Sequence, residues 1–194
     1  WDKQNDLSVL LVLAGTRTAE VAGISAAGAT SEARKYTAVA DAELFLKGPT
    51  HKRFWQLPPL DAGVSPALIS HVALSWLEVQ PVVLAVGLPQ MPPFPHLRIE
   101  SPGFGPSACI ASGKSMDIER VNMLLEKGKV IGRRLKKPLV LCECVPGGTT
   151  TAQAVLTGLG IDVSEFVSSS LIDPPIDIKT NVVSLGLEAA GITM

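Results

Sequence analysis

The chain has 194 residues, of which 46% are hydrophobic and 18% are charged, and its formal net charge at pH 7 is −1. A chain of this length buries about 70% of its unfolded surface, so one domain with a sizeable core is expected. The balanced charge and the lack of long lysine or arginine runs argue against binding to nucleic acid or to a membrane surface. No apolar stretch reaches the roughly 18 residues that a membrane-spanning helix requires.

The three cysteines, Cys109, Cys142 and Cys144, do not form a metal-binding pattern. One residue separates Cys142 from Cys144, whereas zinc knuckles and redox motifs place two residues there. A small, odd number of cysteines is typical of a reducing compartment, so we expect a cytoplasmic protein without a bound metal or cofactor. The chain begins at Trp1 without a methionine or a signal peptide, and we expect that earlier residues are missing.

Three nearly continuous apolar runs, at residues 7–14, 82–87 and 139–142, predict strands that are buried on both faces and therefore parallel. The first run ends in a polar loop that starts at Gly15. A solvated turn and a ligand-binding loop are equally open interpretations of that loop. The second interpretation makes Thr16 and Arg17 candidate ligand contacts.

Helical spacing and capping residues predict helices over residues 38–46, from Ser65 to about residue 80, over 118–135 and over 176–190. The apolar face of the second helix is expected to hold Leu68, Ile69, Val72 and Trp76. The third helix carries two glycines, Gly128 and Gly132, on its apolar face, which predicts tight packing against a neighbour. Six prolines between Leu88 and Pro106 predict a loop without regular structure, either a connector or a stiff cover over a pocket.

These elements predict an α/β fold with a mostly parallel, Rossmann-like sheet and helices on both faces. We expect residues 1–194 to form a single domain, in which residues 16–48 are candidates for a small helical subdomain. A short edge strand is expected near residues 166–170. Because a helix ends the chain, we expect the sheet to be incomplete at the C-terminus and the sequence to be the front part of a longer protein.

Residues 139–160 carry the clearest functional pattern, which is a strand, a glycine turn and a helix start. Gly147 and Gly148 make the turn, and three threonines open the helix. Backbone N–H groups at a helix start are free to bind an anion, and ligands of open α/β sheets lie at the carboxyl ends of strands. The pattern therefore predicts a phosphate on Gly147 to Thr150, with Glu143 facing the polar part of the ligand.

Two segments resemble a known family. Thr16-Arg17-Thr18-Ala19-Glu20-Val21-Ala22-Gly23-Ile24-Ser25 and the small residues after it look like the opening block of proteins related to nicotinate-nucleotide:dimethylbenzimidazole phosphoribosyltransferase, in the branch found in cyanobacteria and archaea. Glu143-Cys144-Val145-Pro146-Gly147-Gly148-Thr149-Thr150 is similar to the Glu-x-x-x-Gly-Asn-Thr-Thr phosphate loop of the bacterial enzyme, with Gly148 in place of asparagine. Residues 113–117 and the helix to Leu135 also resemble the segment before that loop.

The resemblance implies a reaction of cobalamin lower-ligand synthesis. A ring nitrogen of 5,6-dimethylbenzimidazole attacks the anomeric carbon of nicotinate mononucleotide, nicotinate leaves, and α-ribazole phosphate forms with inversion. It also implies a homodimer whose partners are these two substrates. Such a reaction requires a clamp for the 5′-phosphate, stabilisation of a cationic sugar, and a base for the azole proton.

The resemblance also implies roles for individual residues. Gly147, Gly148, Thr149 and Thr150 match the phosphate loop, and Lys179 falls where the bacterial enzymes place a phosphate-contacting lysine at a helix start. Glu143 matches the glutamate that lies near the ribose and the base. The alternatives are an ordinary solvated Lys179 and a Glu143 that only caps the following turn.

No residue matches the glutamate usually assigned as the general base, which lies later in the bacterial sequence than residue 194. Either the chain is truncated, or Glu143 serves as the base, or this branch has another function. One alternative is a non-catalytic protein that binds a mononucleotide or a phosphoribosyl group. A kinase-like phosphate-loop enzyme is disfavoured because the loop lacks the lysine of Gly-x-x-x-x-Gly-Lys-Ser/Thr.

Overall fold

The computed structural model describes residues 7–28, 30–57, 65–101, 103–167 and 173–192. Its centre is a sheet of four parallel strands in the order β3-β2-β1-β4. The strands are β1 (Ser8–Ala14), β2 (Val82–Val86), β3 (Leu97–Arg98) and β4 (Leu139–Cys144). The predicted α/β class with a parallel sheet is confirmed, and β2 lies beside β1 as a crossover connection requires.

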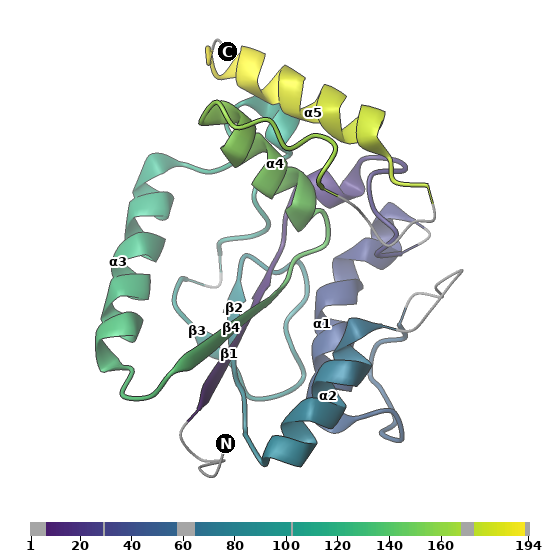
Figure 1. Cartoon of the computed structure of the whole chain (residues 1–194), viewed down its shortest axis with the longest axis vertical. Coiled ribbons are helices and arrows are strands. Elements are labelled where there is room, and N and C mark those ends of the chain that lie inside the picture. Colours follow the sequence, from purple (N-terminus) through teal and green to yellow (C-terminus); the bar gives the residue numbers. More distant parts are fainter. Residues whose placement is uncertain (1–6, 29, 58–64, 102, 168–172, 193–194) are drawn as a thin grey trace.

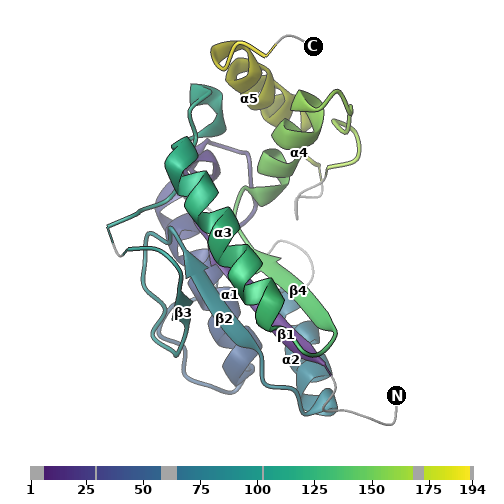
Figure 2. The same ribbon diagram turned by 90° about the vertical axis from the view of Figure 1, so that its left-hand side faces the viewer.

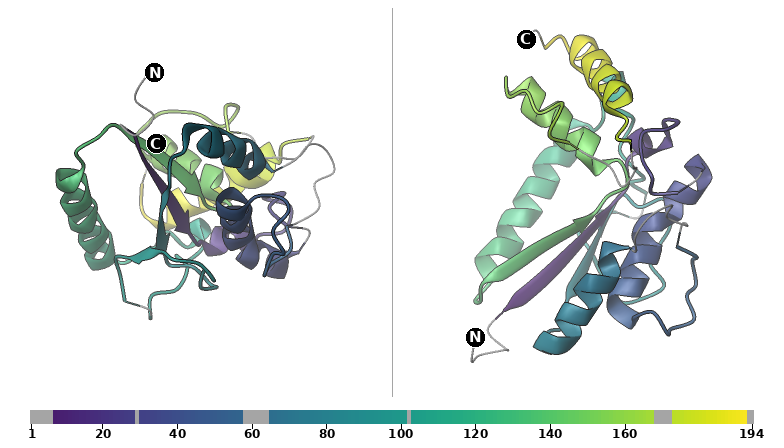
Figure 3. Two further views of the ribbon diagram at one scale, coloured as in Figure 1. Left: turned by 90° about the horizontal axis from the view of Figure 1, so that it is seen from below. Right: turned by 45° about the vertical axis from the view of Figure 1, so that its right-hand side comes forward.

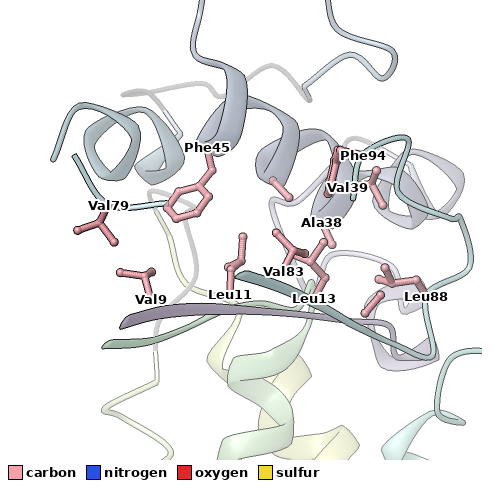
Figure 4. Close-up of a cluster of buried hydrophobic side chains, with 12 residues drawn as sticks. Val9, Leu11, Leu13, Ala38, Val39, Phe45, Val79, Val83, Leu88 and Phe94 are labelled. Carbon is pink, nitrogen blue, oxygen red and sulfur yellow. The ribbon is translucent and has the colours of Figure 1, made fainter. Parts of the chain in front are cut away.

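The helices α1 (Ser31–Lys47) and α2 (Pro66–Leu77) lie on one side of the sheet. The main core fills the space between α1 and the strands, as Figure 4 shows for Val39 and Phe45 of α1 above Leu11 and Leu13 of β1. Burial alternates along β1, with Val9, Leu11 and Leu13 buried and their neighbours partly exposed. The prediction that both faces of this strand are buried is therefore wrong for the described residues.

The helix α3 (Ile118–Arg134) lies on the other side of the sheet (Figures 2 and 3), so the prediction of helices on both faces is confirmed. None of its residues is buried, and a Cβ added at Gly128 or Gly132 would meet no described atom within 4 Å. The predicted tight packing of these glycines is therefore wrong. An ion pair with nearly buried side chains links α3 to the proline-rich loop, where Arg120 donates two hydrogen bonds to Glu100 at 2.8 and 2.9 Å.

The helices α4 (Gly148–Gly158) and α5 (Ile176–Ala189) lie beyond the carboxyl ends of the strands (Figure 1). Two short 3-10 helices, η1 (Arg17–Glu20) and η2 (Ile110–Ser112), join them there. The contact between α5 and η2 is close, because a Cβ at Gly186 would lie 2.5 Å from the Ile110 carbonyl oxygen. This layer places the functional loops of the sequence at one end of the sheet.

Several further expectations are corrected. The helix predicted over residues 38–46 begins earlier, because α1 runs continuously from Ser31 and holds Thr37, whose hydroxyl donates to the Ala27 carbonyl. The helix α2 packs on the core through Ala67, Leu74 and Leu77. The face that was expected to do so is turned outward, since Trp76 is 84% exposed. The proline-rich loop contains the two-residue strand β3. Residues 168–170 of the expected edge strand lie outside the described residues, and 166–167 form no strand.

Among the described helices, none combines the length and the apolar character that a membrane crossing needs.

Candidate functional site

The loop between β4 and α4 forms the predicted glycine turn. Gly147 has a φ of 77°, a left-handed conformation that glycine adopts without strain, and it is the N-cap of α4. It also approaches η1 closely, because a Cβ at this position would lie 3.0 Å from the Ala19 nitrogen. No side chain caps α4. The positive end of the helix dipole is therefore available to an anionic ligand.

Lys179 lies beside this helix start. It belongs to the first turn of α5 and is 1% exposed, yet its Nζ donates a hydrogen bond to Thr149 Oγ1 at 3.0 Å. Burial lowers the pKa of Lys179 from its usual value, because the charged ammonium is removed from water. The structure thus brings two predicted phosphate contacts together, although 30 positions separate them in the sequence.

Glu143 lies in β4, next to its carboxyl end, and remains exposed. Partial burial of its carboxylate raises the pKa, while a hydrogen bond from the Val145 backbone lowers it to a smaller extent. Gly148, which stands in place of the family's asparagine, leaves room beside this carboxylate. A Cβ at Gly148 would lie 3.1 Å from the Val145 Cβ and 3.7 Å from Glu143 Oε2.

A cavity of about 520 Å³ opens beside the loop, a volume within the usual range for small-molecule sites. Glu143, Gly147, Gly148 and Thr149 line it on the side of β4 and α4. The remaining walls come from residues 24–27, from α1, from Pro49, Arg53 and Leu57, and from the start of α2. These walls are mostly apolar, and the charged side chains that line the cavity are Asp41, Arg53 and Glu143.

Thr150 is fully buried and does not line the cavity. Its Oγ1 has no hydrogen-bond partner among the described atoms, and neither does the buried Oε1 of Gln153 one turn later. A role of Thr150 in binding phosphate through its side chain would require a change in its surroundings. That role stays a prediction.

The other candidate loop has a structural part in the site. Thr16 caps η1, since its Oγ1 accepts a hydrogen bond from the Thr18 nitrogen at 3.2 Å. Neither Thr16 nor the exposed Arg17 lines the main cavity. Instead, η1 contacts the turn at Gly147 through Ala19. Thr16 and Arg17 therefore lie near the glycine loop but outside its cavity.

Sequence reasoning missed two residues that shape this region. Arg34 is buried and donates hydrogen bonds to the carbonyl oxygens of Ala19, Val21 and Gly28, which fixes the segment after η1 onto α1. Asp41 places a carboxylate in the cavity. A charge between Ala40 and Ala42 on a helix is the signal that could have found Asp41, whereas Arg34 stands among Glu32 and Lys35 and carries no such signal.

No group of three histidine, cysteine, aspartate or glutamate side chains within the described ranges is arranged to hold a metal ion.

No protein-family model matches the chain. The chain is 61% identical over 185 residues to a UPF0284 protein of Prochlorococcus marinus (strain MIT 9313), an alignment that covers 95% of this chain and 46% of that relative. It is 56% identical to a UPF0284 protein of Parasynechococcus marenigrum (strain WH8102), over 94% of this chain and 46% of the relative. A UPF0284 protein of Gloeothece citriformis (strain PCC 7424) is 40% identical, over 93% and 50%. The chain is thus a close homologue of UPF0284 proteins and spans about half of their length.

Proposed function

We propose that the protein transfers a phosphoribosyl group from nicotinate mononucleotide to a benzimidazole-type base, giving α-ribazole phosphate and nicotinate. The observation that carries this proposal is the buried ammonium of Lys179, held 3.0 Å from Thr149 at the uncapped start of α4. A fixed cation beside a helix N-terminus suits a dianionic 5′-phosphate. The absence of the Walker lysine from the loop sequence argues against a nucleoside triphosphate.

The carboxylate of Glu143 supports the transfer step. As the azole nitrogen bonds to the anomeric carbon, the glycosidic bond breaks and its electron pair leaves on the ring nitrogen of nicotinate. Positive charge that develops on the ribose is stabilised by a nearby carboxylate, and Glu143 lies on the cavity wall beside the phosphate loop. The azole N–H proton is then lost to a base, for which Glu143 is one candidate.

The polar and apolar parts of the cavity lining match the chemical character of the two proposed substrates. Its polar side, at the end of β4, suits a ribose phosphate, and its apolar walls suit a flat aromatic base. The family resemblance adds the expectation of a homodimer, and the sparse cysteines add that of a cytoplasmic location. The alternative is a non-catalytic relative that binds a mononucleotide or phosphoribosyl group through the same loop.

The test uses the full-length protein. Nicotinate mononucleotide should raise the melting temperature, whereas nicotinate riboside, which lacks the phosphate, should have little effect. With 5,6-dimethylbenzimidazole present, chromatography should detect the release of nicotinate. Binding without release would favour the non-catalytic alternative. No stabilisation by any mononucleotide at about 1 mM would exclude both.

A further inference from the structure

Asp41 provides a second carboxylate in the cavity, on the wall that α1 contributes. It lies in the middle of α1 and lines the same space as Glu143. Around it the cavity is lined by apolar side chains, including Ile24, Leu44 and Leu68. A carboxylate in such surroundings is costly unless it accepts hydrogen bonds, so its partners show what it is suited to do.

The two oxygens of Asp41 have unequal partners. Oδ1 accepts a hydrogen bond from Ser65 Oγ at 2.6 Å, which is a strong contact. Oδ2 has the thiol of Cys144 at 3.8 Å, and a thiol is a weak donor. An ionised carboxylate can accept about four hydrogen bonds, so Asp41 retains capacity for a further donor from the cavity.

We propose that Asp41 recognises the ring N–H of the acceptor base, whose apolar ring occupies the part of the cavity between α1 and the start of α2. This inference rests on the proposed function and names the specificity of the same site. The acceptor class is then a fused, apolar heteroaromatic ring that carries an N–H, such as benzimidazole.

The electrostatics of the carboxyl group agree with this role. Burial raises the pKa of Asp41, while the hydrogen bonds from Ser65 and Cys144 lower it to a smaller extent. A carboxylate with a raised pKa is a better proton acceptor. When one azole nitrogen bonds to the ribose carbon and nicotinate leaves with its electron pair, the proton on the other nitrogen passes to Asp41.

A purely structural role must be separated from recognition. Ser65 is the N-cap of α2, where its Oγ accepts a hydrogen bond from the Ala67 nitrogen, so Asp41 also holds a helix cap in place. Loss of that support would lower stability. It would not change which acceptor ring the protein prefers, so ring preference is the decisive measurement.

The experiment compares two ligands on the full-length protein by isothermal titration calorimetry. Benzimidazole has a ring N–H, whereas benzothiazole has a similar shape and a ring nitrogen but no N–H. The wild-type protein should bind benzimidazole roughly 10- to 100-fold more tightly. Equal affinities for the two rings would overturn the proposal without the need for any variant.

The variant Asp41→Asn should bring the two affinities close together and leave the affinity for nicotinate mononucleotide unchanged. Asp173→Asn, at an exposed position outside the cavity, is the matched control and should keep the wild-type preference. If Asp41→Asn does not fold, Ser65→Ala tests the same pair, and a reduced preference for benzimidazole is expected. If the folded variant still prefers benzimidazole as strongly as the wild-type protein does, the role of Asp41 is overturned. Binding of nicotinate mononucleotide in the same experiment would leave the proposed function standing. A wild-type protein that binds no mononucleotide would instead overturn the proposed function.

Discussion

The Nζ of Lys179 lies 3.0 Å from the Oγ1 of Thr149, which connects the first turn of α5 with the first turn of α4. The lysine is almost fully buried, although it is an ordinary surface residue in most proteins. Keeping an ammonium group there costs solvation, and burial lowers the pKa of Lys179 accordingly. A bound phosphate would offset this cost, so we expect ligand binding and Lys179 to be strongly coupled.

The first prediction concerns Lys179→Met, which keeps the length of the side chain and removes its charge. The affinity for nicotinate mononucleotide should fall roughly 10- to 100-fold, because a charge-assisted contact to phosphate is lost. Calorimetric titration measures the effect. The control is Lys129→Met, since Lys129 is half-exposed and pairs only locally with Glu126 among the contacts described. Equal affinities of the two variants would contradict the assignment of Lys179 to the phosphate site.

The second prediction separates steric crowding at the glycine turn from the backbone strain of a positive φ. Gly147→Ala should lower the free energy of unfolding by more than 1 kcal/mol, because an L residue at positive φ is strained and its Cβ would lie 3.0 Å from the Ala19 nitrogen. It should also weaken mononucleotide binding. Gly160→Ala is the control, since Gly160 has a similar φ of 82° with no described atom near its Cβ position. Its loss should be about 1 kcal/mol, with unchanged binding. Urea denaturation of both variants measures the difference.

The third prediction concerns the ion pair between α3 and the proline-rich loop. Arg120 and Glu100 are both nearly buried, and Glu100 also accepts a hydrogen bond from the Gly87 nitrogen at 2.6 Å. Arg120→Leu leaves a buried carboxylate without its cation and should lower the free energy of unfolding by about 3 kcal/mol. The exposed pair of Lys129 and Glu126 is the control, for which Glu126→Gln should cost less than about 1 kcal/mol. A similar loss in both variants would show that the Arg120 pair adds little to the attachment of α3.

The sequence was a good guide wherever the signal was local. Apolar runs located β1, β2 and β4, and the serine and proline at Ser65 marked the start of α2. It was a poor guide to which side of a helix has a neighbour. Periodicity identifies an apolar face, but Trp76 and Gly128 lie on such faces and are exposed or unopposed, because packing depends on elements far away in the chain.

In the candidate site too, local features could be predicted from the sequence and long-range contacts could not. The glycine turn at Gly147 and the carboxylate of Glu143 come from one short segment, so the sequence places them together. Lys179 was matched by resemblance, and its contact with Thr149 agrees with that match, whereas phosphate binding itself remains a prediction. Asp41 could not be found from spacing, because its partners Ser65 and Cys144 lie 24 and 103 positions away.

The last prediction uses the pH dependence of stability to detect the burial of Asp41. Its pKa is raised in the folded protein above the usual value of 3.8, so the folded state binds more protons than the unfolded state between those two values. This contribution to stability is present below pH 3.8 and is lost as the pH rises through the raised folded pKa. Asp41→Asn does not titrate. Its stability relative to the wild-type protein should therefore increase as the pH is raised through this window. Urea denaturation of both proteins at several pH values measures the difference. A constant difference between Asp41→Asn and the wild-type protein across the window would show that the carboxyl group of Asp41 is not desolvated.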